Sequence, residues 1–451
     1  MINEQNNSRR DFIKKAGLGT FGLALGSTLG MSASSYANIV GANDRVRVAA
    51  IGVNGRGFGM AKNFAKQQGC EVAYICDVDS NAMAKTVAGV SEVQKTKPKG
   101  VKDFRTILDK KGLDGVYIAM PDHWHAPGGI LACQAGKHVY VEKPLSHNPY
   151  EGELLVEAAR KYNRVVQMGN QRRSWPKIME CVQELNNGII GRAYFAKGWY
   201  TNNRKPIGVG KVVPVPANLD YELWQGPAPR RPYKDNLIHY NWHWFWNWGT
   251  GEALNNGTHE IDVMRWGLGV EYPTRVTSVG GRYAYKDDWE TPDTQVISMD
   301  FPGNKTIVWE GRSCNNHPIE GSGRGAIFYG DKGTIVTTGD NGYTVFDLNN
   351  KVIKKVEDEV KTNTIDPAGP GDRLDAFHIN NFLDCVRTGK QPNGDIEIGR
   401  KSVLLCQLGN IAQRTGRVLN CDQKTGHILN DNEAMALWRR DYEPGWEPKI
   451  A

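Results

Sequence analysis

The chain has 451 residues, of which 40% are hydrophobic and 23% are charged, and its formal net charge is +7. This length and composition are typical of one large or two ordinary globular domains. Because no basic run is interleaved with aromatic residues, we expect no nucleic-acid partner. No run of about 18 apolar residues lies beyond the first forty positions, so we expect no membrane span in the body of the chain.

The N-terminus has the pattern of a twin-arginine export signal. Arg9 and Arg10 precede a weakly apolar run over residues 18–31, and small residues follow up to Ala37. This order predicts a targeting segment over residues 1–37 and export of the mature chain, for instance to the periplasm. The twin-arginine route carries folded proteins, often with a cofactor inside, so the signal also hints at a bound non-protein group.

The eight cysteines are scattered along the chain without any C-x-x-C pair. We therefore expect neither a zinc site nor a redox dithiol, and no metal among the functional groups. Several of these cysteines lie in apolar strand or helix patterns, where a buried small hydrophobe is the simpler role. A disulfide formed after export is compatible with the sequence but is not implied by it.

The first half of the chain, from Val46 to Gly169, alternates short β-branched runs with amphipathic segments. Strands are predicted at 46–53, 71–77, 115–119, 138–142 and 165–169, and helices at 58–68, 127–135 and 150–162. This alternation predicts a parallel sheet covered by helices. We therefore expect a dinucleotide-binding Rossmann domain over residues 38–168.

The first predicted strand runs into a glycine-rich turn, IGVNGRGFG, over residues 51–59. A dinucleotide site needs a tight turn, a close approach of the backbone to the pyrophosphate and a helix N-terminus aimed at the anion. Asn54 stands where the middle glycine of the usual spacing would be, and asparagine tolerates positive φ. We expect the cofactor to contact Gly52, Asn54, Gly55, Arg56 and Gly57.

Asp77 ends the second predicted strand, twenty residues after Gly57. A carboxylate there can accept hydrogen bonds from an adenosine ribose and would repel a 2′-phosphate. No arginine follows in residues 77–84 to bind that phosphate, so NAD is favoured over NADP. The alternative is a structural turn with a solvated aspartate.

The segment MPDHWHAPGG, residues 120–129, follows the third predicted strand and falls on the sheet edge where open α/β folds bind ligands. His123 and His125 are two apart on an expected loop with no third ligand nearby, which argues against a metal site. One imidazole could instead cap the following helix. We expect contacts to cofactor or substrate from Pro121, Asp122, His123, Trp124 and His125.

The segment VYVEKPLSHNP, residues 139–149, places Glu142 and Lys143 at the end of another strand, before a proline that restricts the lysine backbone. We expect Glu142 beside the cofactor and the ammonium of Lys143 in the crevice where a nicotinamide would lie. A partly desolvated lysine can have a lowered pKa and can polarise or protonate a developing alkoxide. The alternative is a surface lysine that snorkels from a strand end.

Longer β-rich runs dominate the chain after Gly169. They lie at residues 192–200, 274–285, 295–301, 305–313, 325–330 and 333–340. Within an overall α/β fold class, they predict an α+β domain over residues 169–374 with one large open, mainly antiparallel sheet, which can bury one face and offer the other to a ligand or a partner subunit. A helical pattern over residues 375–417 follows, and then a tail over residues 418–451 that lacks periodicity and could wrap a neighbour.

Two segments suggest substrate contacts. The segment NWHWFWNWGTGE, residues 241–252, spaces four tryptophans two apart, which puts them on one face if the segment is extended. Such a face, with Trp246 among its rings, suits the apolar surface of a pyranose, but core packing accounts equally well for two of the four. Asn170, Arg172 and Arg173 follow the last Rossmann strand, where fixed donors suit a hydroxyl-rich or anionic substrate, with salt bridges to Asp or Glu as an equal alternative.

The motif GKHVYVEKP at residues 136–144, followed far downstream by NNGTHEIDVMRW at residues 255–266, resembles the Gfo/Idh/MocA family of glucose–fructose oxidoreductase and inositol dehydrogenase type. The resemblance extends over nearly the whole mature chain. It implies that Lys143 is a catalytic residue beside the nicotinamide and that His259 is the acid/base histidine, with Asp262 three residues on.

One position departs from the family pattern. Asn255 stands where an aspartate often lies, four residues before the histidine. Asparagine can position a hydroxyl but cannot accept its proton, so the role of general base falls to His259, with Lys143 as a candidate helper. On a helix His259 and Asp262 would share one face, and we expect substrate contacts from Asn255 and Asp262.

The resemblance and the export signal together predict an exported oxidoreductase. It would move a hydride between a sugar or glycoside hydroxyl carbon and a tightly bound nicotinamide cofactor, NAD rather than NADP. An alternative of another class is an NAD-dependent glycosidase or lyase. It would transiently oxidise a ring hydroxyl, eliminate the aglycone and then reduce the sugar again. A weaker alternative is a non-catalytic carbohydrate sensor, which would give Lys143 and His259 no functional role. The family also implies a homodimer or homotetramer formed through the open sheet.

Overall fold

The computed structural model describes residues 45–339, 342–357 and 372–451. The export signal predicted over residues 1–37 lies outside the described residues. In the described ranges, no helix is long and apolar enough to cross a membrane.

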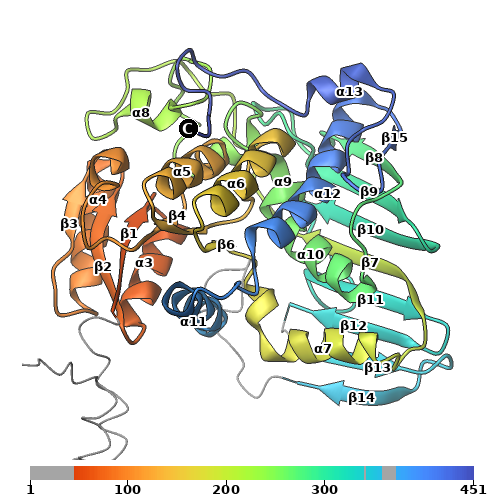
Figure 1. The fold of residues 1–451 in the computed structure, drawn as a ribbon. Helices are drawn as coiled ribbons and strands as arrows, with labels where there is room; N and C mark the ends of the chain where they lie inside the picture. The colour runs from red at the N-terminus through yellow and green to blue at the C-terminus, as the bar shows by residue number, and fades with distance from the viewer. Residues whose placement is uncertain (1–44, 340–341, 358–371) are drawn as a thin grey trace, which may run out of the picture. The chain divides into compact units, whose positions relative to one another are not determined.

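Six strands form the first sheet, in the order β3-β2-β1-β4-β5-β6 (Figure 1). The strands are β1 Val46–Ile51, β2 Cys70–Cys76, β3 Lys99–Val101, β4 Gly115–Ile118, β5 His138–Val141 and β6 Val166–Met168. The helices between them are α3 Arg56–Lys66, α4 Ser80–Ser91, α5 Asp122–Gln134 and α6 Pro149–Lys161. All strand pairs in this sheet are parallel, so the predicted Rossmann-type half is confirmed.

The central strands of this sheet are apolar on both faces because helices cover each side. Tyr117 packs with Phe64 of α3 on one face. The next residue, Ile118, joins Leu155 of α6 in the core on the other face. Alternate side chains therefore serve opposite helix layers, which explains why these strands read as nearly continuous apolar runs.

Nine strands form the second sheet, in the order β14-β13-β12-β11-β7-β10-β9-β8-β15. They are β7 Ala193–Thr201, β8 Arg275–Gly281, β9 Thr294–Phe301, β10 Lys305–Arg312, β11 Arg324–Gly330, β12 Thr334–Thr338, β13 Tyr343–Phe346, β14 Val352–Val356 and β15 Leu419–Asn420. Neighbouring strands are antiparallel except β7 and β10, so the expected mainly antiparallel sheet is confirmed. The strands β13 and β14 were not predicted, nor were β3 and β15.

Helices of the second half cover one face of this sheet. They are α7 Pro176–Asn186, α10 Gly257–Leu268 and α12 Ile396–Thr415. The shorter helical elements elsewhere in this half are η2 Gln171–Ser174, α8 Tyr221–Gln225, η3 Asn241–Trp244, α9 Gly251–Asn255 and α13 Asn432–Ala436. A Cβ on Gly198 of β7 would lie 2.7 Å from Met264 of α10, and a Cβ on Gly409 of α12 would lie 2.4 Å from Ile297 of β9. Both glycines therefore permit close packing of helix against sheet.

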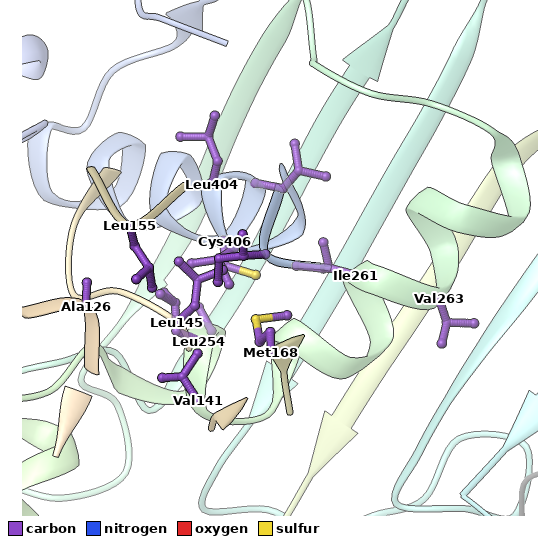
Figure 2. Packing of buried hydrophobic residues seen from close by; sticks show 14 of the residues in the cluster. Ala126, Val141, Leu145, Leu155, Met168, Leu254, Ile261, Val263, Leu404 and Cys406 are labelled. Carbon is purple, nitrogen blue, oxygen red and sulfur yellow. The ribbon is translucent and has the colours of Figure 1, made fainter. Parts of the chain in front are cut away.

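A continuous apolar core joins the two halves (Figure 2). Val141, Leu145 and Leu155 come from the Rossmann half, whereas Ile261 belongs to α10 and Leu404 to α12. Because both halves contribute to one core, the side chains that each half presents at their junction are held in a defined arrangement.

The C-terminal part of the chain returns to the Rossmann half. The helical pattern predicted over residues 375–417 forms two helices, α11 Asp372–Thr388 and α12, and Phe382 of α11 packs edge-on against Tyr140 of β5. In the tail, Arg440 pairs with Glu151 of α6 at 2.7 Å. The tail, which the sequence suggested could wrap a neighbour, here packs on helices of its own chain.

Candidate active site

A cavity of about 1040 Å³ opens at the carboxyl ends of the parallel strands. Residues that follow β1, β2, β4, β5 and β6 line it, and residues of α8, η3, α9, α10 and α11 complete its wall. This is the edge at which open α/β sheets bind ligands. The volume suits a cofactor together with a small substrate.

The glycine turn before α3 has the shape that a dinucleotide pyrophosphate needs. Gly52 has a φ of 75°, and a Cβ there would lie 2.6 Å from the backbone nitrogen of Met120. A Cβ on Gly57 would lie 1.9 Å from the carbonyl oxygen of Gly52, so Gly57 supports the turn without lining the cavity. Among the described residues no side chain caps the start of α3; the amide of Gly57 donates to the carbonyl oxygen of Asn54 at 3.1 Å, and the neighbouring amides of the first turn can face an anion. The turn residues that line the cavity are Gly52, Asn54, Gly55 and Arg56.

Asp77 lines the cavity just after β2. Its carboxylate oxygens accept hydrogen bonds from the N–H groups of Val53 at 2.7 Å and Asp79 at 2.9 Å. Burial raises the pKa of Asp77, although these hydrogen bonds oppose the shift. Each oxygen keeps a further lone pair for a ribose hydroxyl. Lys102 and His239 line the same cavity, and His239 is hydrogen-bonded to Asp79 at 2.9 Å.

Arg56 connects the glycine turn to two carboxylates. Its guanidinium is bidentate on Asp375 of α11, at 2.8 and 2.7 Å, and its Nε donates to Glu142 at 3.1 Å. Burial raises the pKa of Glu142, and the charge of Arg56 opposes that rise. Arg56 and Glu142, both predicted to contact the cofactor, therefore bind each other and fasten α11 to this end of the cavity.

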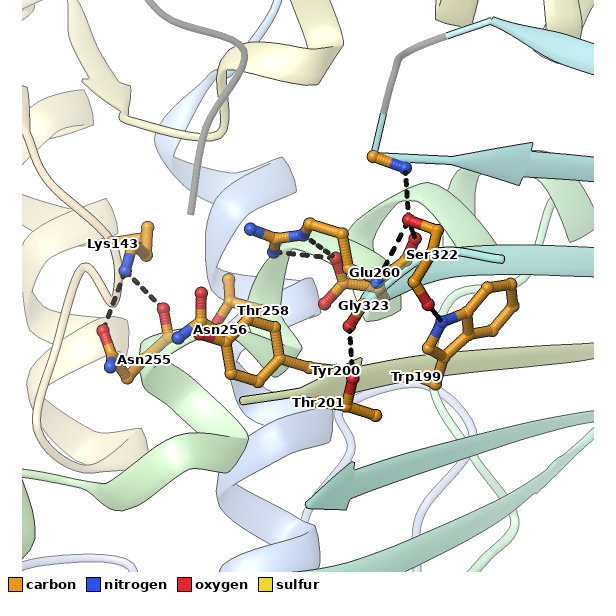
Figure 3. Close-up of polar contacts among 12 residues, drawn as sticks. Lys143, Trp199, Tyr200, Thr201, Asn255, Asn256, Thr258, Glu260, Ser322 and Gly323 are labelled. Carbon is orange, nitrogen blue, oxygen red and sulfur yellow. Dashed lines mark hydrogen bonds and ion pairs between the residues drawn. The ribbon is translucent and has the colours of Figure 1, made fainter. Parts of the chain in front are cut away.

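Lys143 projects into the cavity from the end of β5. Its ammonium donates to the backbone carbonyl of Asn255 and, at 3.1 Å, to Oδ1 of the same residue (Figure 3). Burial lowers the pKa of Lys143, and the charges of Glu142 and Asp122 oppose the shift. The alternative of a lysine that snorkels onto the outer surface is therefore wrong, and the ammonium is set where it can donate a proton more readily than in water.

His259 lies in the first turn of α10, lines the same cavity and is 7% exposed. Burial and the positive charges of Arg324 and Lys143 lower its pKa well below the usual 6.5. The imidazole is therefore neutral at physiological pH and able to accept a proton. Lys143 and His259 are far apart in the sequence, and the fold brings them to one cavity.

The amide of Asn255 is oriented by partners on two sides. Its Oδ1 accepts from Lys143, and its Nδ2 donates to Glu252 at 3.2 Å. Arg204 pairs with Glu252 at 2.7 Å, and Ser313 donates to it at 3.1 Å. Burial opposes ionisation, but Arg204 and these hydrogen bonds hold the pKa of Glu252 below its usual value. Asn255 is thus fixed on the cavity wall, as a group that positions a substrate hydroxyl must be.

The segment 120–129 is helical rather than a loop, because α5 starts two residues into it. The hydroxyl of Thr250 donates to Asp122 at 2.5 Å, and burial raises the pKa of Asp122 to about 7. His123 does not line the cavity, since its Nε2 is hydrogen-bonded to the carbonyl oxygen of Trp224 at 3.0 Å. The residues of this segment that line the cavity are Pro121, Asp122, Trp124 and His125.

Three of the predicted substrate contacts form a buried cluster outside the cavity. Arg173 is bidentate on Asp262, at 2.9 and 2.8 Å, and Asn170 donates to the same carboxylate at 2.9 Å. Ser402 of α12 donates to it at 2.6 Å. For Arg173 the salt-bridge alternative therefore holds. His259 and Asp262 share α10 as expected, but only His259 lines the cavity.

The four tryptophans of residues 241–252 do not share one face, because residues 241–244 form the 3₁₀ helix η3 rather than a strand. Trp246 lies outside the cavity, with the guanidinium of Arg414 4.8 Å from its ring centre. Trp242 lines the cavity and stacks on His243 at 3.6 Å between ring centres. The aromatic part of the cavity wall is thus Tyr240, Trp242 and His243.

Core packing explains the other two tryptophans, since Trp244 and Trp248 are 1% and 3% exposed. Sequence reasoning also missed Leu223 and Trp224 of α8, which line the cavity. No local pattern could have identified them, because α8 has only five residues and reaches the cavity through tertiary packing alone.

Within the ranges that the structure describes, no group of three or more His, Cys, Asp or Glu side chains is placed to hold a metal ion. The eight cysteines all lie in these ranges, and none forms a disulfide.

The parallel sheet, the glycine turn and the cavity shared by Lys143 and His259 define a nucleotide-binding oxidoreductase with two α/β halves. A model described as "Oxidoreductase family, NAD-binding Rossmann fold" matches residues 46–170, and one described as "Oxidoreductase family, C-terminal alpha/beta domain" matches residues 199–365. The two models together cover well over half of the chain, which belongs to the Gfo/Idh/MocA family.

Curated relatives include glycosyl hydrolase family 109 proteins. One from a Shewanella species is 28% identical over 214 residues, and one from Saccharopolyspora erythraea is 29% identical over 208 residues. These matches cover 43% and 44% of this chain and 46% and 45% of the relatives. The chain thus spans about half the length of the curated relatives it matches.

Similar solved structures include levoglucosan dehydrogenase in complex with NADH and levoglucosan, at 18% identity and a TM-score of 0.64. Another is aldose-aldose oxidoreductase from Caulobacter crescentus complexed with glycerol, at 17% identity and a TM-score of 0.62. Each match covers 83% of this chain and 99% of the other chain. At these identities the likeness shows the fold alone.

Proposed function

We propose that this chain moves a hydride between the hydroxyl carbon of a sugar or glycoside and a nicotinamide cofactor. The observation that carries the proposal is that Lys143, Asn255 and His259 line the same cavity as the glycine turn and Asp77. A proton donor, a hydroxyl-positioning amide and a neutral base therefore share one site with a dinucleotide cradle.

The protein residues have separate roles in this reaction. Neutral His259 takes the proton of the substrate hydroxyl, Asn255 positions that hydroxyl, and the ammonium of Lys143 stabilises the developing alkoxide. The nicotinamide, when bound, supplies the acceptor for the hydride that leaves the hydroxyl-bearing carbon.

Two findings support a carbohydrate substrate. Tyr240 and Trp242 place aromatic rings on the cavity wall, and such rings suit the apolar C–H surface of a sugar ring. The similar structures include a levoglucosan dehydrogenase and an aldose-aldose oxidoreductase.

The cofactor we propose is NAD, tightly bound. Asp77 supports NAD because its carboxylate, next to the expected 2′ position of the adenosine ribose, would repel a phosphate there. Arg56, which clamps α11 through Asp375 to the glycine turn, supports slow release because α11 would have to move. Titration of the purified protein with NADH and NADPH, followed by nicotinamide fluorescence, measures both the affinity for NADH and its preference over NADPH.

Replacement of the lysine tests the proposed reaction. We expect Lys143→Ala to lower kcat by about 1000-fold with NADH affinity retained, because the alkoxide loses its charged partner. Lys110→Ala is the matched control, since Lys110 is 52% exposed and does not line the cavity. The measurement is the absorbance of reduced nicotinamide after mixing NAD-loaded protein with a panel of sugars. Unchanged turnover in Lys143→Ala would discard this mechanism.

A second candidate is an NAD-dependent glycosidase, which the glycosyl hydrolase family 109 relatives favour. Transient oxidation of a ring hydroxyl would acidify the neighbouring C–H bond, and elimination and reduction would follow at the same residues. Product analysis separates the two candidates. A ketosugar with net reduced cofactor indicates the oxidoreductase, and a cleaved glycoside without net redox change indicates the glycosidase.

Export and self-association are further parts of the proposal. The pair Arg9 and Arg10 supports export by the twin-arginine route, and the open sheet of nine strands supports a homodimer or homotetramer. Cell fractionation of the full chain and of a variant with both arginines changed to lysine tests export. Sedimentation of the mature protein tests assembly.

A further inference from the structure

Arg172 and Arg173 are adjacent in η2 but have opposite surroundings. Arg173 is bidentate on Asp262, and its guanidinium also lies 4.6 Å from the ring centre of Trp266. Arg172 is 7% exposed and lines the cavity. Across the described residues, no side chain or carbonyl accepts a hydrogen bond from its guanidinium. Its guanidinium nitrogens are not among the fully enclosed polar atoms, so their five donors face the cavity, where water or a ligand can accept from them.

The acidic groups near Arg172 are already paired with other arginines. Glu260 accepts from Arg324 at 2.9 Å, and Asp262 is held by Arg173. Burial and the charge of Arg324 lower the pKa of Arg172 to about 10, so it is still positive at neutral pH. One positive charge without a protein counter-ion is therefore left on the cavity wall.

The charge of Arg172 also acts on the proposed base. Burial lowers the pKa of His259, and the charges of Arg324, Lys143 and Arg172 lower it further. An anion bound to Arg172 would offset part of this charge and raise the basicity of His259 while the substrate is bound. Anion binding and proton transfer would thus be coupled.

We propose that the substrate is a sugar acid whose carboxylate pairs with Arg172, while Lys143 and His259 contact the hydroxyl that reacts. This inference rests on the proposed function and adds the class of sugar. A guanidinium binds a carboxylate through two parallel hydrogen bonds, which fixes orientation as well as affinity. Tyr240 and Trp242 would contact the C–H surface of the sugar ring.

Matched pairs of sugars test the inference. Calorimetry on the NADH-loaded protein compares glucose with glucuronate, galactose with galacturonate, and each with glucose 6-phosphate. We expect the preferred acid to bind about 100-fold more tightly than its neutral partner, because a buried charge then gains its counter-ion. In Arg172→Gln this preference should vanish while affinity for the neutral sugar and for NADH is retained, and Arg172→Lys should restore part of it.

Arg275→Gln is the matched control, because it removes the same charge from a side chain that is 59% exposed and does not line the cavity. A second readout is the pH dependence of kcat/KM. In Arg172→Gln its acid limb should move to higher pH, since the free enzyme loses a charge that depresses the pKa of His259.

The outcomes separate this inference from the proposed function. Equal affinity for every acid and its neutral partner, tighter binding of glucose 6-phosphate than of any acid, or loss of NADH affinity in Arg172→Gln would each overturn the carboxylate assignment. Oxidation of a sugar acid that Arg172→Gln leaves unchanged would overturn it too, with the proposed function intact. Arg172-dependent binding of an acid without oxidation or cleavage would support the inference and end the proposed function.

Discussion

The two ends of the cavity are built in different ways. At the cofactor end, backbone geometry dominates: Gly52 and Gly57 let the chain pass within contact distance of itself, and the start of α3 faces the cavity without a side-chain cap. At the substrate end, side chains from η2, η3, α9 and α10 converge, and ion pairs behind the wall hold them. The first end therefore depends on steric exclusion, and the second depends on buried charges that are correctly paired.

The largest expected effect comes from breaking the ion pair behind the substrate end. Asp262→Asn should lower the free energy of unfolding by about 3–5 kcal/mol, because Arg173 is left buried without its counter-ion. Asp300→Asn is the control, since its pair with Arg275 is exposed and worth at most about 1 kcal/mol. Urea unfolding measures both. Equal losses in the two variants would show that burial of the pair does not matter.

The next effect tests steric exclusion at the cofactor end. Gly57→Ala should weaken NADH binding by about 100-fold, because the added Cβ would lie 1.9 Å from the carbonyl oxygen of Gly52 and must displace the turn. Gly323→Ala is the control and should bind NADH normally, because a Cβ on Gly323 would have the carbonyl oxygen of Thr201 as its nearest neighbour, at 3.3 Å, and Gly323 does not line the cavity. Fluorescence titration compares them, and normal binding by both would remove the steric account.

Buried histidines near the two ends should make stability depend on pH. Burial lowers the pKa of His123 to about 3 and those of His125 and His378 to about 4, so each is neutral in the folded protein. Below pH 6.5 the unfolded chain binds more protons at these sites, so each histidine removes about 1.4 kcal/mol per pH unit as the pH falls. Asp122, whose pKa is raised to about 7, acts in the opposite direction below pH 7.

The measurement for this prediction is the unfolding temperature between pH 7.5 and pH 5. It should fall with pH in the full chain, and it should fall less steeply in His378→Gln, which removes one of the three sites and lies outside the cavity. A profile that does not change with pH would contradict the neutral state of these imidazoles.

The smallest expected effect concerns the choice of cofactor. Asp77→Ala should reduce the preference for NADH over NADPH by about tenfold, because the carboxylate that would repel a 2′-phosphate is gone. Asp109→Ala serves as the control, since the side chain of Asp109 is 80% exposed. An unchanged ratio of the two affinities would contradict the assignment of this preference to Asp77.

Local patterns were sufficient for much of the fold. Period-two and apolar runs predicted five of the strands in the parallel sheet and six of those in the open sheet, because each run reports which faces of a strand are covered. They failed for β3, β13, β14 and β15, and for the tryptophans of residues 241–252, where spacing alone could not distinguish a strand from a 3₁₀ helix. The start of α5 was missed because its first turn lies in a segment that looked like a loop.

Local patterns were enough to predict a nucleotide turn, an acid after the second strand and a lysine after the fifth strand, because each of these patterns has its own geometry. The resemblance also placed Lys143 and His259 in one site, whereas tertiary packing was needed to show that Arg172 faces this cavity while its neighbour Arg173 pairs with Asp262. The physical reason is that the charge balance of a buried side chain is set by residues distant in the chain, and a local pattern carries no information about them.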